Sequence, residues 1–213
     1  MIRGVVFDLD GVLADTERLQ WTAYRTVLRD FGVDVDLEEY RREWIRTGRG
    51  PEYACRRYGL PIGPDELRAR KAPAYRALLG TGLAPMPGAA DALRRLRDGY
   101  RLALATNTGR DETTLVLERL GLAGLLHAAV VREDYAAPKP APDAYLAAGR
   151  ALGLPPAECV VVEDTERGAR AGLAAGMRVI AAPSELTFDN DFTGCSHRLR
   201  SLDDLTPALL RTL

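Results

Sequence analysis

The strongest constraint on the fold is an apolar run followed by two aspartates, GVVFDLDG, at residues 4–11. Its first four residues are β-branched, aromatic or glycine, which is typical of a short buried strand. Asp8 and Asp10 follow at a spacing that places both carboxylates on one face if the strand continues. Two buried carboxylates repel each other unless a cation, a proton or a basic side chain lies between them. The stretch therefore predicts a buried strand that ends at a charged site. An Asp-rich turn that caps the next helix is the alternative.

The composition is that of an ordinary globular chain and argues against nucleic acid and membranes as partners. The 213 residues are 46% hydrophobic and 28% charged, with a net charge of −1. There is no basic excess to attract nucleic acid, and no apolar run reaches the roughly 20 residues that span a bilayer. Three cysteines without CxxC spacing and no recognisable signal segment indicate a reducing compartment. We expect a cytoplasmic monomer or weak dimer that binds neither nucleic acid nor membranes.

Residues 15–84 show helical periodicity and no convincing strand. The first helix is predicted from apolar residues that share one helix face, Trp21, Tyr24, Leu28 and Phe31. Further helices are predicted over residues 37–46, 52–58 and 64–79, and Pro73 should kink or break the last of them. The segment therefore reads as a bundle of four helices inserted after the first strand.

Beyond a turn-rich joint at residues 80–88, helices alternate with strands. Strands are predicted over residues 101–105, 128–131, 159–162 and 178–181. This alternation predicts a Rossmann-like α/β core, in which helices cover both faces of a parallel sheet. We expect a discontinuous core domain formed by residues 1–14 and 85–213, and an α-helical domain formed by residues 15–84.

Polar residues gather where the predicted strands end, and open parallel sheets bind ligands beyond the carboxyl ends of their strands. The residues at these ends are Asp8 and Asp10, Thr106 and Asn107, Lys139 between two prolines, and Glu163 with Asp164. Each has an ordinary alternative as a helix cap, a turn residue or a solvated charge. Four such coincidences at one edge favour a single site instead.

The predicted site has the chemistry of phosphoryl transfer. A set of oxygen ligands suits a hard cation, with Mg²⁺ the first choice, and Mg²⁺ with open water positions usually meets a phosphate. Thr106 and the backbone N–H groups of residues 107–109 offer donors to an anion. Lys139 offers a compact positive charge. Two aspartates can act as nucleophile and as general acid and base.

These motifs, in this order, resemble the four motifs of the haloacid dehalogenase superfamily. The helical insertion is similar to the small α-helical cap of its phosphoglycolate phosphatase and β-phosphoglucomutase branch. The resemblance covers nearly the whole chain. It implies that Asp8 is a nucleophile that forms an aspartyl-phosphate and binds Mg²⁺. It also implies that Asp10 is the acid and base, with its backbone carbonyl on the metal.

The resemblance implies roles for the remaining motif residues. Thr106 and Asn107 would bind the phosphoryl group, and Lys139 would stabilise Asp8 and the transferred phosphoryl. Asp164 would bind the metal, and Glu163 would bind it directly or support a ligand. The chain joints at residues 15–16 and 81–85 would be hinges on which the cap closes.

Departures from the family pattern bear on the reaction. β-Phosphoglucomutases usually carry a histidine where Gln20 stands and a lysine in the loop at residues 108–110, although Arg110 could substitute for that lysine. Dehalogenases lack the aspartate at the position of Asp10 and need no metal. The leading prediction is a phosphatase acting on a small phosphorylated metabolite, a sugar phosphate or a phosphoglycolate-like acid. A sugar phosphomutase of the β-phosphoglucomutase type is the alternative, and a binding protein that retains the fold is a third.

Arg49 lies between two glycines in the predicted cap. We hypothesise that it contacts an anionic or hydroxylated leaving group of the substrate. An ordinary solvated arginine is an equal alternative.

Overall fold

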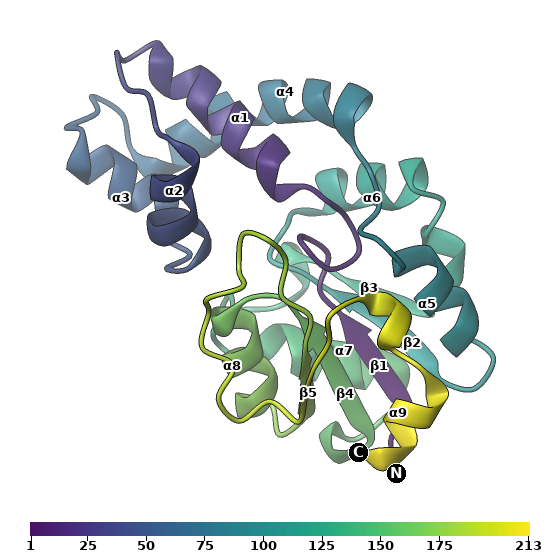
Figure 1. The fold of residues 1–213 in the computed structure, drawn as a ribbon. Coiled ribbons are helices and arrows are strands. Elements are labelled where there is room, and N and C mark those ends of the chain that lie inside the picture. The colour runs from purple at the N-terminus through teal and green to yellow at the C-terminus, as the bar shows by residue number, and fades with distance from the viewer. The chain divides into compact units, whose positions relative to one another are not determined.

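A computed structural model describes all 213 residues, which divide into two compact units. The first, here called the α/β unit, comprises Met1–Ala14 and Ala84–Leu213. The second, here called the helical unit, comprises Asp15–Leu83. Figure 1 shows the sheet of the first unit and the helices of the second. None of the helices combines the length and apolar character needed to cross a membrane.

The α/β unit is built on a six-stranded parallel sheet in the order β3-β2-β1-β4-β5-β6. The strands are β1 (Gly4–Phe7), β2 (Arg101–Ala105), β3 (Ala128–Val130), β4 (Cys159–Glu163), β5 (Arg178–Ala181) and β6 (His197–Arg198). β1 lies between β2 and β4, and its Val5, Val6 and Phe7 are 0% exposed. The continuous apolar character of β1 follows from this central position, because helices cover both faces of such a sheet. The predicted fold class is confirmed.

The edge strand β6 was not predicted. It consists of only His197 and Arg198, both exposed, and pairs with Ile180 and Ala181 of β5. Two exposed polar residues carry no apolar pattern from which a strand could be recognised.

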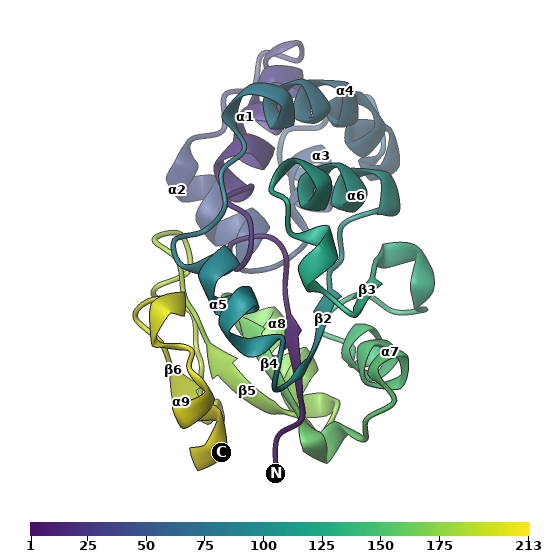
Figure 2. The ribbon, with the colours of Figure 1, turned by 90° about the vertical axis from the view of Figure 1, so that its right-hand side faces the viewer.

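Helices cover the sheet in two groups. They are α5 (Ala89–Leu96), α6 (Arg110–Arg119), α7 (Asp143–Leu152), α8 (Glu166–Ala174) and α9 (Pro207–Thr212). Short 3₁₀ turns lie at Ala123–Leu125, Arg132–Asp134, Pro156–Glu158 and Leu202–Asp204. Because parallel crossovers are right-handed, α5 and α6 lie on one face and α7 and α8 on the other. Ala148 of α7 and Ala171 of α8 share one buried cluster with Val6 and Val161 of the sheet. The direction of the chain along the sheet reverses between β1 and β4, which is where such folds bind ligands (Figure 2).

The helical unit contains α1 (Glu17–Arg29), α2 (Leu37–Glu39), a π-helical turn (Tyr40–Ile45), α3 (Gly50–Arg57) and α4 (Pro64–Gly82). α4 packs on α1 and buries residues at four-residue spacing, Leu67, Lys71, Tyr75 and Leu79. Of the kink or break predicted at Pro73, the break is wrong, because the helix continues through this residue. Proline removes one helical hydrogen bond, and the buried face on both sides of Pro73 holds the helix together.

Candidate active site

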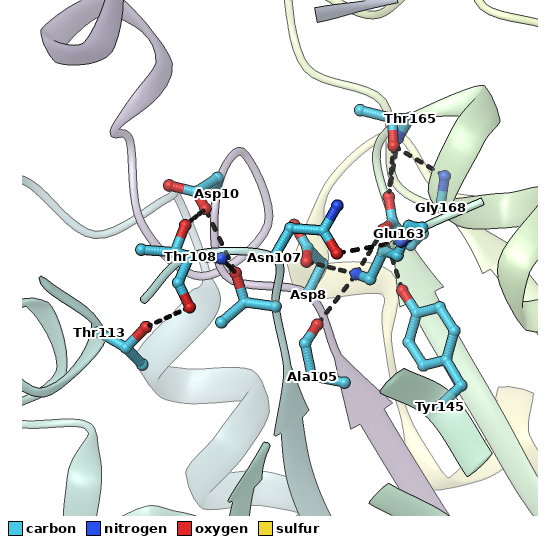
Figure 3. A network of polar contacts seen from close by, with 12 residues as sticks. Asp8, Asp10, Ala105, Asn107, Thr108, Thr113, Tyr145, Glu163, Thr165 and Gly168 are labelled. Carbon is cyan, nitrogen blue, oxygen red and sulfur yellow. Dashed lines mark hydrogen bonds and ion pairs between the residues drawn. The ribbon is translucent and has the colours of Figure 1, made fainter. Parts of the chain in front are cut away.

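The motif residues of the α/β unit lie together at the carboxyl ends of β1, β2 and β4 (Figure 3). Asp8 directly follows β1, and its backbone N–H donates to Val162 O of β4 at 3.0 Å. Thr106 directly follows β2, and its N–H donates to Val130 O of β3 at 3.0 Å. Sheet hydrogen bonding therefore extends to both residues and fixes the backbone that carries their side chains.

Lys139 connects two buried carboxylates. Its Nζ lies 2.6 Å from Asp8 Oδ1, 2.9 Å from Glu163 Oε1 and 2.9 Å from Ala105 O. These three acceptors use all three ammonium donors, and Lys139 is only 5% exposed. Its backbone N–H donates to Asn107 Oδ1 at 3.1 Å, which ties the Lys139 loop to the residues after β2. The basic side chain that the buried aspartate requires is therefore Lys139.

Glu163 is saturated with donors from the protein. Its Oε1 accepts from Lys139 and from the Tyr145 hydroxyl at 2.9 Å. Its Oε2 accepts from the Thr165 N–H and Thr165 Oγ1, each at 3.0 Å. A Cβ at Gly168 would lie 1.7 Å from Glu163 Oε1, so only glycine fits beside this carboxylate. Four donors occupy about the full acceptor capacity of a carboxylate. This arrangement favours a supporting role for Glu163 over direct contact with a metal.

Burial and the neighbouring charges change the pKa values of Asp8, Lys139 and Glu163. Burial is the largest influence on Asp8 and raises the pKa of its carboxyl to about 7, against the opposing effect of Lys139. Burial also opposes ionisation of Lys139, but the neighbouring Asp8 and Glu163 outweigh it and hold the pKa of Lys139 above its usual value. Burial acts in the same way on Glu163, but Lys139 and the hydrogen bonds keep the pKa of Glu163 below its usual value. Asp8 is thus the carboxyl that changes protonation near neutral pH.

Asp10 belongs to a second set of contacts. Its Oδ2 accepts from Thr108 Oγ1 at 2.7 Å and lies 3.4 Å from Thr106 Oγ1. The Thr108 N–H donates back to Thr106 Oγ1 at 3.0 Å, which closes the turn after β2. The Asp10 carboxyl is therefore held by the turn that follows β2. Sequence reasoning missed Thr108, although it stands two residues beyond the predicted Thr106.

Three carboxylates form a possible metal site. Oxygens of Asp8, Glu163 and Asp164 all lie within 4.8 Å of one another. Gly11 has a φ of +75°, and a Cβ there would lie 2.3 Å from Asp164 Oδ2, so glycine lets the loop approach this carboxylate. Thr187 Oγ1 donates to the same oxygen at 3.3 Å. Closely spaced carboxylate oxygens with no nitrogen or sulfur ligand fit Mg²⁺. The Asp10 side chain is not part of this cluster.

Two tyrosines of the site were not recognised in the sequence. The Tyr145 hydroxyl binds Glu163, and its ring centroid lies 4.5 Å from Lys139 Nζ. The Tyr135 hydroxyl lies 2.7 Å from Asn107 Oδ1 and 2.8 Å from Thr106 O. Both look like ordinary packing residues in the sequence, because no spacing links them to the motifs.

The structure also places two arginines that were singled out in the sequence. Arg49 is an exposed residue of the helical unit, immediately before α3, and its contact with a leaving group stays a prediction. Arg110 binds the Asp134 carboxylate, and its backbone N–H donates to Glu133. Because the Arg110 guanidinium is paired with Asp134, it is a poor substitute for the lysine that β-phosphoglucomutases usually carry in this loop.

The sheet order and the inserted helical unit define an α/β enzyme fold. Its candidate site lies where the strand order reverses, between β1 and β4. A family model described as haloacid dehalogenase-like hydrolase matches residues 5–182. Because this match spans most of the chain, the chain belongs to that family. The predicted resemblance is confirmed.

Relatives and solved structures agree with this assignment. Protein CbbY of Rhodobacter capsulatus is 32% identical over 94% of this chain and 94% of its own length. The fructose-1-phosphate phosphatase YqaB of Escherichia coli is 29% identical over 83% of this chain and 94% of its own length. A crystal structure of CbbY from Rhodobacter sphaeroides with xylulose-(1,5)bisphosphate has a TM-score of 0.87 at 31% identity, and covers 99% of each chain. The predicted class of enzyme, a haloacid dehalogenase-like phosphatase, is confirmed at the level of the family.

Proposed function

We propose that this chain is a Mg²⁺-dependent phosphatase that hydrolyses a small phosphorylated metabolite through an aspartyl-phosphate on Asp8. The observation that carries the proposal is the buried Asp8 at the end of the central strand, with Lys139 Nζ 2.6 Å from its Oδ1. Lys139 contacts Oδ1, which leaves Oδ2 as the oxygen that we propose attacks phosphorus. A nucleophile held by a neighbouring cation in a buried site is the arrangement that covalent phosphoryl transfer requires.

The first half of the proposed reaction transfers the phosphoryl group to Asp8. The Asp8 carboxylate forms a bond to phosphorus while the ester P–O bond breaks. The leaving oxygen takes a proton from Asp10, whose carboxyl the Thr108 hydroxyl positions at 2.7 Å. Lys139 balances the negative charge that Asp8 and the phosphoryl group bring together.

The second half releases phosphate. Asp10, now ionised, takes a proton from a water molecule whose oxygen attacks phosphorus. The bond between phosphorus and Asp8 breaks, which restores both carboxyl groups to their starting states. Asp8 and Asp164 would hold Mg²⁺ with the backbone carbonyl of Asp10, and the bound ion would neutralise charge on the phosphoryl oxygens. We assign Glu163 to the support of Lys139, because its oxygens already accept four hydrogen bonds.

For the substrate, we propose a sugar phosphate, with a phosphoglycolate-like acid as the second choice. Support comes from two relatives, one named a fructose-1-phosphate phosphatase and one crystallised with a sugar bisphosphate. In this proposal the helical unit is a cap that excludes water during transfer, and Arg49 contacts the part of the substrate that leaves. Thr106 and Asn107 bind the phosphoryl group. We further propose a cytoplasmic location, which the three free cysteines support.

Phosphate release from a panel of sugar phosphates, sugar bisphosphates and phosphoglycolate tests the proposal. The reaction is run with Mg²⁺, with EDTA, and with the Asp8→Asn variant. We expect release only when both Mg²⁺ and Asp8 are present, and the ranking of kcat/KM then gives the substrate class. Phosphorylation of Asp8 without phosphate release would indicate a phosphomutase instead. Release that persists in Asp8→Asn would contradict the proposed nucleophile.

A further inference from the structure

The end of the sheet opposite Asp8 carries two adjoining cavities, both within the α/β unit. One, of about 300 Å³, is lined by Arg3, Arg97, Arg101 and His127 among others. The other, of about 380 Å³, is lined by Arg95 and Arg211 among others. Both include Arg3, Gly99 and Tyr100 in their walls, so they adjoin, and together they are here called the basic groove. Figures 1 and 2 show this region where β1 begins and α9 ends, with both chain termini nearby.

Positive charge in the basic groove is poorly compensated. Its walls hold the five arginines named above and one carboxylate, Asp98, in a chain whose net charge is −1. The guanidinium groups of Arg97 and Arg211 form no ion pair or hydrogen bond. Such a local excess in a nearly neutral chain produces a positive potential that attracts anions.

The other three arginines of the groove have only weak compensation. Arg3 pairs with Glu158 at 2.8 Å, and this pair is exposed to solvent. Arg95 and Arg101 donate to backbone carbonyls, which carry no net charge to cancel the guanidinium. By contrast, Arg25 and Arg29 of the helical unit share the Asp34 carboxylate.

The groove is also built on rigid backbone. The Arg101 N–H donates to Arg3 O at 2.9 Å, so these two residues are joined where β1 and β2 begin. The Leu102 N–H donates to His127 Nδ1 at 3.0 Å. A neutral imidazole whose Nδ1 accepts a hydrogen bond carries its proton on Nε2, which leaves a donor for a ligand. The groove thus offers an N–H donor beside its guanidinium groups without first rearranging.

We propose that the basic groove binds a small molecule that carries at least two phosphoryl groups. Guanidinium groups bind phosphate oxygens in a two-pronged geometry, and Arg3 between the two cavities allows one phosphoryl group in each. Cavity volumes at the lower end of about 300–1,000 Å³ suit a small ligand rather than the flat surface of a macromolecule.

This ligand does not compete with the substrate for Asp8. The four residues of β1 separate Arg3 from Asp8, and at roughly 3.3 Å per residue a strand of this length places the two ends more than about 10 Å apart. The groove is therefore a second anion site, distinct from the proposed catalytic centre.

Isothermal titration with pyrophosphate, in EDTA and at low salt, tests the proposal on the whole chain. The variants are Arg97→Ala, Arg211→Ala and their combination, one arginine from each cavity. Arg150→Ala, an exposed arginine of α7, is the matched control. We expect saturable binding that weakens at least about tenfold in each single variant and further in the double variant, because each removes a charge-assisted contact. The control should bind as the natural chain does.

Phosphate release from the substrate should stay unchanged in all of these variants, which separates this test from that of the proposed function. A charge-reversed pair, Arg97→Glu with Arg211→Glu, should abolish pyrophosphate binding. Absence of saturable binding to the natural chain would overturn the proposal. Equal affinity of the double variant and the Arg150→Ala control would overturn it as well, since the probe would then bind elsewhere.

Discussion

Replacing Tyr145 by phenylalanine tests whether Glu163 and its hydrogen bonds hold Lys139 in position. The substitution removes one hydroxyl and keeps the ring that lies 4.5 Å from Lys139 Nζ. The lost hydrogen bond, 2.9 Å long, joins two side chains that are at most 1% exposed, Tyr145 and Glu163. Water therefore cannot replace the missing donor without rearrangement of the core.

The size of the effect follows from the charge on the acceptor. Hydrogen bonds to charged groups contribute about 1.5–3 kcal/mol to stability. Glu163 Oε1 keeps its contact with Lys139 in the variant, so we expect the lower end, about 1.5 kcal/mol. Glu163 also fixes the position of Lys139, so kcat should fall several-fold while KM changes little, with about 1.4 kcal/mol corresponding to tenfold.

Tyr135→Phe is the matched control, because the Tyr135 hydroxyl contacts only the neutral oxygens of Asn107 and Thr106. It should lose only about 0.5–1.5 kcal/mol. Urea unfolding followed by circular dichroism gives the two free energies of unfolding, and initial rates give kcat and KM. If Tyr145→Phe lost no more stability than Tyr135→Phe and kept its kcat, the assigned support of Lys139 through Glu163 would be refuted.

Three further perturbations probe the same site. Gly168→Ala places a Cβ 1.7 Å from Glu163 Oε1 and should cost about 1–3 kcal/mol in urea unfolding, whereas Gly124→Ala, with no atom within 4 Å, should cost nothing. A loss no greater in the first than in the second would contradict the packing described. Lys139→Met leaves Asp8 and Glu163 buried without their cation, so it should lower the free energy of unfolding by about 3–5 kcal/mol and abolish turnover. An active, stable variant would exclude the role given to Lys139. Finally, burial raises the pKa of Asp8 to about 7, so below that pH Mg²⁺ must displace a proton. Its apparent affinity, measured by titration, should fall as pH falls through 7 and approach about tenfold per pH unit. Asp8→Asn should bind Mg²⁺ more weakly, and its affinity should not show this dependence on pH. An affinity of the unsubstituted chain for Mg²⁺ that does not change with pH would contradict the raised pKa of Asp8.

Local sequence patterns predicted the sheet because each buried strand is apolar by itself. β2 and β5 have the predicted bounds, and β1, β3 and β4 are recognised from short runs rich in valine and alanine. The charged residues near the strand ends are predictable for a similar reason, since parallel strands end at one edge. β6 could not be predicted in this way, because its two exposed residues form a strand only through their pairing with β5.

Contacts that depend on long-range packing could not be predicted. Tyr145 meets Glu163 only because α7 packs on the sheet at one particular register. The resemblance gave Asp8 as a partner of Lys139, but nothing in the sequence indicated its second partner, Glu163. The continuity of α4 through Pro73 likewise reflects tertiary packing that overrides a local preference.

Trapping the covalent intermediate tests the central claim most directly. The enzyme is mixed with Mg²⁺ and its best substrate, quenched in acid within the first turnover, and reduced with borohydride, which converts an aspartyl-phosphate to homoserine. Mass spectrometry of the peptide that contains Asp8 and Asp10 then identifies the modified residue. The account predicts homoserine at residue 8 alone, and none in Asp8→Asn. Phosphate release with no modification at residue 8, or with modification at residue 10 instead, would contradict it.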